Sequence, residues 1–436
     1  MTAAEKILQK ALVASHIDSS QWNSIQAALR DRAFFSSQVA QANILQGLRK
    51  MAADRASGVS ASDARVAMRE ALKRLGHETP QELQGTIKDL YSKSRLDVII
   101  KTNVAQARGF IDWMEANSPG AYAAFPAQEF LRVKAVKNPR GDWPKRWQKA
   151  GGKIFPGLRM IALKDDPVWV KLSVFDNPFP PFDWGSGMGL EDIGRKEAVK
   201  LGLIDDKELS KRVAKKREEK PVGFNGKLQA ELPMKDDSPE AAKLKAVFGD
   251  LVRIDNGVAK WRPEILKETV MTGKNFEIDI GVPDSRLLEK LASQPSTAGF
   301  AEAIKGKPLT IDQTWRDTKA SNGGTHIKHF KPNKKQPSDI PLVEEDFEMV
   351  PSMWRNPSRV LKLRSDLFSC ELDAFDGSTY VMQISIAEGS PKFWTFFKTK
   401  NPTSKKIARG NLSPTDGGPK AVREASHSRR TANIIA

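Results

Sequence analysis

Residues 359–399 read RVLKLRSDLFSCELDAFDGSTYVMQISIAEGSPKFWTFFKT. Four runs in this stretch are rich in β-branched and aromatic residues, as β-strands are: 359–363, 368–375, 379–387 and 392–399. Asp376-Gly377-Ser378 joins the second run to the third, and residues 388–391 join the third to the fourth. Both connections have the length and glycine content of hairpin turns. The stretch therefore predicts four consecutive antiparallel strands.

The third run also predicts that one face of this sheet is buried. From Tyr380 to Ile386, every second residue is apolar, and this period places the apolar side chains on a single face. A helix is expected over residues 342–353, immediately before the strands. We therefore predict that residues 301–405 form an α+β domain with a four-stranded antiparallel sheet, followed by a basic flexible tail over 406–436.

The N-terminal region predicts a mainly α domain over residues 1–115. Thr2 and Glu5 have the spacing of a capping box at the start of a helix. Ser60 is expected to cap a second helix that ends at Gly76. Thr79-Pro80-Gln81-Glu82 has the pattern of another capping box, and apolar residues at helical spacing then continue to Trp113.

Residues 116–204 differ in composition, being rich in Pro, Gly and Trp, and we expect a loop-rich α+β module there. Its stretch 175–189, FDNPFPPFDWGSGMG, has the glycines of a phosphate-binding loop. Such a loop must follow an apolar strand, whereas Pro180 and Pro181 exclude a central strand and no Lys-Ser/Thr pair follows. A helix starting near residues 190–192 would leave anion binding open.

Two segments separate this module from the C-terminal domain. Residues 205–245 are dense in charges of both signs and then rich in Pro and Gly, so we expect a charged linker. Residues 246–300 predict a small mixed segment, with a helix around 264–269, a short strand at 276–280 and a helix over 283–291. The predicted fold is thus multidomain: mainly α at the N-terminus, a loop-rich α+β module in the middle, and α+β at the C-terminus.

Composition limits the partners and cofactors. The 436 residues carry a net charge of +17, which favours a polyanionic partner such as nucleic acid, the alternative being a solvated basic surface. One cysteine, Cys370, and five histidines make a structural metal unexpected, and no cofactor is predicted. No run of about 18 apolar residues occurs, so no membrane span is expected.

Several motifs in the middle of the chain together resemble the phage Mu F-like family of head morphogenesis, or minor capsid, proteins. They are 95–103, 143–147, 151–153, 160–167 and 180–188. The motif residues that we single out are Trp143, Trp147, Pro180, Pro181, Trp184, Gly185 and Gly187. The resemblance implies a protein of the virion, made in the host cytoplasm, that acts with portal and capsid or scaffold proteins.

One departure from related head proteins concerns metal binding. Those of the Gram-positive phage type have histidine and cysteines after the prolines, where this chain has Asp183, Trp184 and Ser186. No metal site is therefore expected.

The C-terminal pattern, with His326-x-x-His329 ahead of the strands and Asn356-Pro357 before the first, resembles the barnase/EndoU/colicin/RelE-like nuclease domains of phages. The resemblance implies metal-independent RNA cleavage, in which the ribose 2′-hydroxyl attacks the adjacent phosphorus. Such cleavage needs a base, an acid and cations, and histidine suits the first two roles. The catalytic candidates are His326, His329, Arg355, Thr395 and Lys398. The nucleic-acid-binding candidates are Lys328, Lys331, Arg359 and Trp394.

Other interpretations remain open. Trp394 and Phe396, on the face of Lys398, suit a base-stacking platform but equally suit the protein core. The two histidines have the spacing of an ordinary surface pair. The C-terminal domain would then bind nucleic acid or portal without catalysis. An ADP-ribosyltransferase-like domain, with Glu371 or Glu388 as its acidic residue, is the third interpretation.

Overall fold

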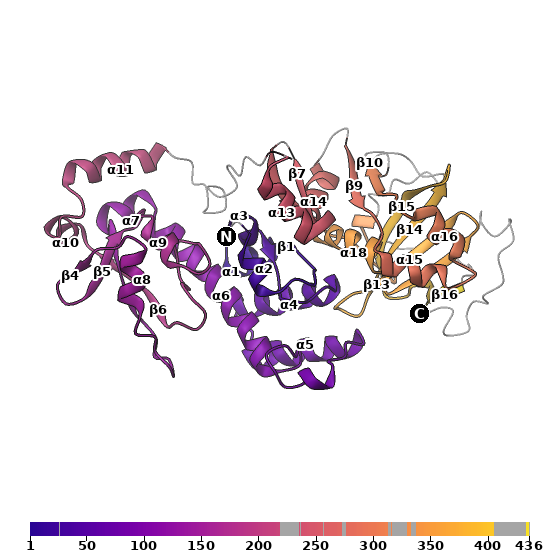
Figure 1. Ribbon diagram of the computed structural model, residues 1–436, viewed down its shortest axis with the longest axis horizontal. Helices are drawn as coiled ribbons and strands as arrows, with labels where there is room; N and C mark the ends of the chain where they lie inside the picture. The colour runs from indigo at the N-terminus through magenta and orange to yellow at the C-terminus, as the bar shows by residue number, and fades with distance from the viewer. Residues whose placement is uncertain are drawn as a thin grey trace.

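The structure is a computed structural model that describes residues 1–25, 27–218, 235, 237–255, 257–272, 276–312, 315, 329–332, 337–404 and 433–435. The molecule is elongated (Figure 1). The middle module lies at one end, the N-terminal helices lie at the centre, and the large C-terminal sheet lies at the other end. Among the described residues, no helix combines the length and the apolar character that crossing a bilayer requires.

The N-terminal region is mainly helical, as predicted. Its helices are α1 (Ala3–Leu8), α2 (Ser19–Asn23), α3 (Ala27–Asp31), α4 (Ala42–Ala56), α5 (Ala61–Arg74) and α6 (Lys93–Ala116), and the short strands β1 (Ala11–Leu12) and β2 (Ala33–Phe34) pair in parallel. The capping box of Thr2 and Glu5 is present at α1. Ser60 caps α5, and Gly76 follows that helix with a φ of +66°. Both predicted helix starts are confirmed.

The expected helix start at residues 79–82 is wrong. Only the 3-10 turn η1 (Gln81–Leu83) forms there. The Thr79 hydroxyl donates to Asp89 Oδ1 at 2.9 Å instead of capping a helix, and the same carboxylate accepts from the Gly85 amide at 2.8 Å. The long helix α6 begins eleven residues further on from this motif, at Lys93, where the Ser92 hydroxyl accepts from the Arg95 amide.

The middle module is built on a small antiparallel sheet of the order β4-β5-β3-β6. Its strands are β3 (Ala127–Arg132), β4 (Ile154–Phe155), β5 (Arg159–Leu163) and β6 (Met188–Ile193). Its helices are α7 (Pro119–Ala124), α8 (Trp143–Lys149), α9 (Val168–Leu172), α10 (Arg195–Lys200) and α11 (Asp206–Glu218). Separate apolar clusters cover the two faces, one around Phe130 and Trp147 and the other around Tyr122 and Ile161. The sequence indicated the aromatic anchors but not this sheet.

Residues 219–234 and 236 of the predicted linker lie outside the described residues, and its two ends belong to the helices α11 and α13 (Pro239–Phe248). Past it, a small unit packs back onto the N-terminal helices. It consists of α13, the turn η2 (Gly249–Leu251) and the hairpin of β7 (Val252–Asp255) and β8 (Val258–Trp261). Trp261 stacks on Trp22, and its indole N–H donates to the Leu29 carbonyl at 2.7 Å. Helix α14 (Arg262–Thr272) then leads to the C-terminal sheet.

The four predicted C-terminal strands form in order and antiparallel. They are β12 (Arg359–Arg364), β13 (Leu367–Asp373), β14 (Thr379–Ala387) and β15 (Ser390–Thr399). The elements before them are β9 (Glu277–Gly281), α15 (Ser285–Ala292), α16 (Ala298–Ile304), β10 (Leu309–Asp312), β11 (Asp339–Ile340), η4 (Glu344–Met349) and α18 (Val350–Arg355). The helix expected over 342–353 is thus a 3-10 segment followed by a short α-helix.

The sheet is larger than the four strands expected. Its order is β16-β12-β13-β14-β15-β10-β9, with β11 also pairing with β15, and β16 is Asn433–Ile435. Strand β10 runs parallel to β15, which makes the sheet mixed. Of the additional strands, β9 corresponds to the short strand expected at 276–280. The others, β10, β11 and β16, are short and pair with partners distant in the sequence, so local alternation did not indicate them. Of the predicted tail, 406–436, residues 406–432 and 436 lie outside the described residues.

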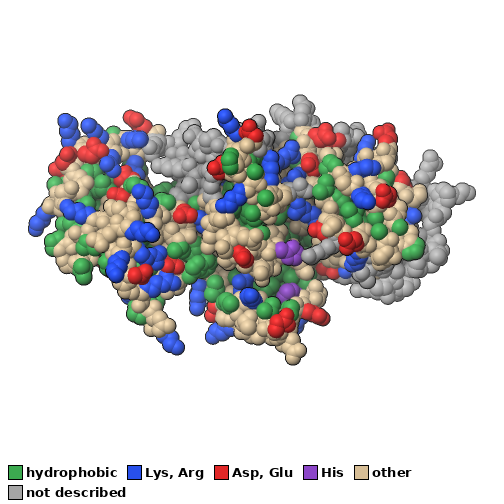
Figure 2. All heavy atoms as spheres, in the orientation of Figure 1, with side chains coloured by type: hydrophobic (Ala, Val, Ile, Leu, Met, Phe, Trp, Pro, Cys, Tyr) green, Lys and Arg blue, Asp and Glu red, His purple; other side chains and the backbone are tan. Residues whose placement is uncertain are grey.

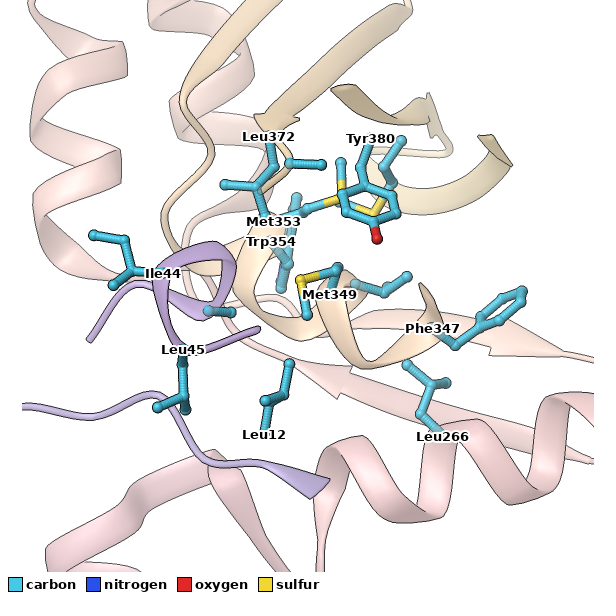
Figure 3. Close-up of a cluster of buried hydrophobic side chains, with 14 of the residues drawn as sticks. Leu12, Ile44, Leu45, Leu266, Phe347, Met349, Met353, Trp354, Leu372 and Tyr380 are labelled. Atoms are coloured by element: carbon cyan, nitrogen blue, oxygen red, sulfur yellow. The ribbon is translucent and has the colours of Figure 1, made fainter. Parts of the chain in front are cut away.

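The N-terminal helices and the C-terminal sheet enclose one common core (Figure 3). Leu12, Ile44 and Leu45 from the N-terminal region lie in the same apolar cluster as Trp354, Leu372 and Tyr380 from the C-terminal region. Helix α4 also approaches the β13–β14 turn closely, because a Cβ atom on Gly47 would overlap the ring of Phe375. These two regions therefore depend on each other for their packing.

Candidate functional site

The C-terminal sheet has one apolar and one polar face. On the apolar face, Phe368, Cys370, Leu372, Tyr380, Met382, Ile384 and Phe396 enter the common core. We call the opposite side the polar face; on β13, β14 and β15 its hydroxyl, amide and carboxylate side chains are those of Ser369, Glu371, Asp373, Thr379, Gln383, Ser385, Thr395 and Thr399. Most of these side chains are buried. Buried polar groups need hydrogen-bond partners, and so many of them on one sheet face, next to His329, make this face the candidate site.

Strand register aligns three polar side chains across the centre of this face. Ser369 lies opposite Gln383, which lies opposite Thr395. Residues directly opposite on neighbouring strands point to the same side, so these three side chains form one row. Within the described part of the chain, the buried hydroxyl of Ser369 has no hydrogen-bond partner. The row thus contains a polar atom that folding alone does not satisfy.

His329 lies at the Thr395 end of the row. Its Nε2 atom is 3.3 Å from Thr395 Oγ1, and its ring stacks on Phe397 with centroids 5.7 Å apart and an interplanar angle of 22°. The backbone holds the residue as well, because the Leu342 amide donates to the His329 carbonyl at 2.8 Å. The structure therefore brings two predicted catalytic residues together. Ser369 and Gln383 were not among the residues predicted from the sequence, although the alternation of apolar and polar residues on β13 and β14 indicates their face.

Arg359 occupies the β12 side of the polar face, where acidic residues bind it. Its guanidinium donates to both carboxylate oxygens of Asp373, at 2.8 and 2.5 Å, and to Glu371 at 3.3 Å. The hydrogen bonds to Asp373 raise the pKa of Arg359. Glu371 is fully buried and also accepts from the Ser404 hydroxyl. The predicted phosphate contact of Arg359 would therefore compete with these carboxylates.

The expected platform of Trp394, Phe396 and Lys398 does not form. A β-bulge shifts the register of β15, so that Gln383 faces Thr395 but Ile384 faces Phe393. Trp394 is the additional residue of this bulge and is 48% exposed, whereas Phe396 is fully buried in the core. Bulges interrupt the alternation from which faces are inferred.

Lys398 points to the apolar side of the sheet, into a buried polar network. Its Nζ atom is 2.9 Å from Asp376 and 3.9 Å from Asp346. The Tyr380 hydroxyl donates to Asp346 at 2.6 Å, and burial raises the pKa of both groups. This predicted catalytic lysine is thus separated by the sheet from His329 and Thr395.

The remaining predicted C-terminal residues are placed as follows. Arg355 is the half-buried last residue of α18, and Lys331 is exposed two positions after His329. His326 and Lys328 lie outside the described residues. Among the described residues, no group of three or more His, Cys, Asp or Glu side chains is arranged to hold a metal ion.

The motif residues of the middle module converge around the stretch 175–189. Trp143 and Trp147 are buried in one cluster with Phe182, and the Pro180–Pro181 peptide bond is cis. Gly185 and Gly187 have φ values of +59° and +68°, whereas Trp184 is 46% exposed. The glycines lead into strand β6 and not into a helix. The helix start near residues 190–192 is therefore wrong, and it gives no support for anion binding there.

A hollow of about 470 Å³ lies between α6 and β6, apart from the polar face. Trp113, Phe179 and Pro180 form much of its wall, and Asp112 and Glu191 make it acidic. Burial and the neighbouring Glu115 raise the pKa of Asp112. Its acidic lining does not suit a phosphate-bearing ligand.

Comparison with known proteins leaves the family open. No family model matches the chain, and no curated protein or solved structure is significantly similar to it.

Proposed function

We propose that this chain is a phage minor head protein of the Mu F-like type with a metal-independent, RNase-like site on its C-terminal sheet. In this proposal it acts with portal and capsid or scaffold proteins in head assembly and DNA packaging. The single observation that carries the catalytic part is the pair of His329 and Thr395, 3.3 Å apart on a buried polar sheet face.

The assembly part is supported by the way the family-like motifs come together. Trp143 and Trp147 from one motif, Met160 from a second and Phe182 from a third lie in one apolar cluster. Motifs that are separated in sequence but share an apolar core form one structural module. This is what we expect of motifs that together characterise a family.

The proposed reaction follows from the residues on the polar face. His329 accepts the proton of the ribose 2′-hydroxyl, a bond forms between the 2′-oxygen and phosphorus, and the bond from phosphorus to the 5′-oxygen breaks. The 5′-oxygen takes a proton from a general acid, for which the sequence offers His326. Thr395 orients the imidazole through the 3.3 Å contact. Exposed Lys331 is the cation that we assign to the phosphate, since Arg359 already binds Asp373.

The test of the catalytic part is cleavage of RNA by the full chain in EDTA. We expect His329→Ala to lower the rate at least about 100-fold, because general base catalysis contributes on that order. His16→Ala is the matched control, since His16 is an exposed histidine far from the sheet in sequence and should leave the rate unchanged. Equal rates in both variants, or no cleavage by the unaltered chain, would refute the proposal.

The assembly part has a separate test. Mass spectrometry of purified phage particles and procapsids should detect this chain together with portal protein. Particles that assemble normally and lack the chain at both stages would contradict the assembly role.

A second candidate function is nucleic-acid binding without catalysis. It is favoured over catalysis by the placement of Lys398, a predicted catalytic cation that lies on the other face of the sheet from His329. Its signature would be salt-dependent RNA binding by the full chain without any cleavage products.

A further inference from the structure

A second charged feature lies in the middle module, between the end of β3 and the end of α8. Residues 133–149, VKAVKNPRGDWPKRWQK, contain six Lys or Arg residues and one acidic residue. We call this segment the basic arm. Its first part projects from the module beyond β6 (Figure 1), and basic side chains gather on this part of the surface (Figure 2).

Hydrogen bonds fix the base of the arm to the glycine-rich stretch before β6. The amides of Val133 and Lys134 both donate to the Gly187 carbonyl at 3.0 Å. Arg132 donates to the Ser186 carbonyl at 2.8 Å, and Arg140 donates to the Trp184 carbonyl at 3.2 Å. The arm is therefore held in one orientation before it meets a partner, which lowers the entropic cost of binding.

Most of the charge on the arm is uncompensated. Asp183 forms ion pairs with Arg140 and Arg146. The other four basic residues are exposed and have no ion-pair partner among the residues that the structure describes: Lys134, Lys137, Lys145 and Lys149. Four unpaired lysines on one short segment attract a polyanion, and each would release counterions from it.

An aromatic side chain lies beside these charges. Trp184 is 46% exposed, and its ring meets the edge of Phe175 at a centroid distance of 4.9 Å. Arg140, whose guanidinium contacts the Trp184 carbonyl, connects this ring to the arm. Exposed aromatic rings next to cations are the usual means of stacking unpaired bases.

We propose that the basic arm and Trp184 form a nucleic-acid-binding surface that contacts the phosphate backbone without regard to sequence. The lysines bind phosphates, and Trp184 stacks on bases where the strand is single. This surface belongs to the middle module and does not depend on the proposed C-terminal nuclease site. Loss of either activity would leave the other in place.

The first test measures binding of a labelled oligonucleotide to the full chain by fluorescence anisotropy at several salt concentrations. We expect Lys134→Glu/Lys137→Glu to weaken binding to duplex DNA and to reduce the slope of log Kobs against log salt by about 1.8, at about 0.9 for each lost phosphate contact. Lys196→Glu/Lys200→Glu, which changes two exposed lysines of α10 in the same module, is the charge-matched control. Equal losses in both double variants would overturn the proposal.

Trp184→Ala separates the stacking contact from the charge. It should lower affinity for single-stranded DNA by about tenfold and affinity for duplex DNA much less, because only unpaired bases stack on a side chain. Equal effects on both substrates would remove Trp184 from the surface.

A second measurement locates the contact directly. Lysine acetylation followed by mass spectrometry should show that bound oligonucleotide protects Lys134, Lys137, Lys145 and Lys149 but not Lys196. Unchanged acetylation of the arm at saturating oligonucleotide would contradict the proposal. Stronger protection by poly-glutamate than by oligonucleotide would assign the arm to an acidic protein instead, which also overturns it.

Discussion

At the scale of single residues, two glycines allow the stretch 175–189 to pack closely against neighbouring segments. Helix α6 meets the cis-proline turn at Gly109, where a Cβ atom would overlap the Pro180 carbonyl. Gly187 has a φ of +68°, and a Cβ atom there would lie 2.5 Å from the Lys134 carbonyl oxygen. Glycine is needed at both positions, because the backbone of one segment contacts the other directly.

Gly187→Val should therefore destabilise the middle module. The left-handed backbone alone costs a β-branched residue about 1–3 kcal/mol, and the overlap with Lys134 adds to this. Urea unfolding followed by tryptophan fluorescence measures the effect. Gly120→Ala is the control, because a Cβ atom there would meet no described atom within 4 Å outside its own helix backbone, and a helix favours alanine. An unchanged midpoint for Gly187→Val would show that this packing is incorrect.

Lys6 gives a prediction about pH. Burial lowers its pKa to about 8 from 10.5, although Asp31 lies 3.0 Å away and opposes the shift. Between pH 8 and 10.5, the unfolded chain binds the proton that the folded chain has released. This difference makes the free energy of unfolding rise with pH in that window. The gain in urea midpoint from pH 8 to 10.5 should be smaller in Lys6→Met than in the unaltered chain; equal gains would contradict the shift.

At the scale of elements, the local sequence pattern predicted those strands that pair with the next strand along the chain. Strands β12 to β15 formed within a few residues of the expected bounds, because alternation and the glycines of their turns are local signals. Strand β9 formed within one residue of the short strand expected at 276–280. Strands β10, β11 and β16 were not predicted, since their pairing depends on distant partners. The bulge at Trp394 was not predicted either, because a bulge interrupts the alternation from which faces are inferred.

The candidate site was predictable to a similar extent. The sequence predicted both His329 and Thr395 as catalytic residues, and in the structure His329 Nε2 lies 3.3 Å from Thr395 Oγ1. It also included Lys398, which the strand directs to the opposite face towards Asp376. The sequence pattern indicates on which face of the sheet a side chain lies, but not which residue pairs with it. That pairing decides whether a lysine or arginine can still bind a phosphate.

The polar row on β13 to β15 carries a prediction about stability. Ser369→Ala should raise the free energy of unfolding by about 1 kcal/mol, because it removes a buried hydroxyl without a described partner. Ser404→Ala should lower it, since that hydroxyl donates to buried Glu371. Urea unfolding of the two variants checks the contrast. Destabilisation by both would mean that Ser369 has a structural role.

At the scale of the whole molecule, the C-terminal sheet does not have a core of its own. The cluster beneath it includes Leu45 and Leu48 of α4 and Leu266 of α14, which lie outside the sheet. By contrast, the two clusters that cover the small sheet of the middle module contain only residues of that module, and a third joins its Phe179 to Phe110 of α6. Sequence composition suggested boundaries between these regions but could not show which of them share a core.

Residues 301–436, expressed alone, should therefore not fold cooperatively. The fragment lacks β9 and the N-terminal side of the common core, so its apolar face would be exposed to water. Residues 93–218, which retain α6 and both clusters of the middle module, should unfold in one cooperative transition. Circular dichroism during urea titration compares the two, and cooperative unfolding of 301–436 would contradict the shared core.

The central claim is that the polar face of the C-terminal sheet cleaves nucleic acid through a ribose 2′-hydroxyl at His329. The most direct measurement uses the full chain in EDTA with a DNA oligonucleotide that contains a single ribonucleotide. The account predicts one cut, immediately 3′ of the ribonucleotide, with a 2′,3′-cyclic phosphate end, and loss of this cut in His329→Ala. Cleavage of an all-DNA oligonucleotide at a comparable rate, or an intact chimeric substrate, would contradict it.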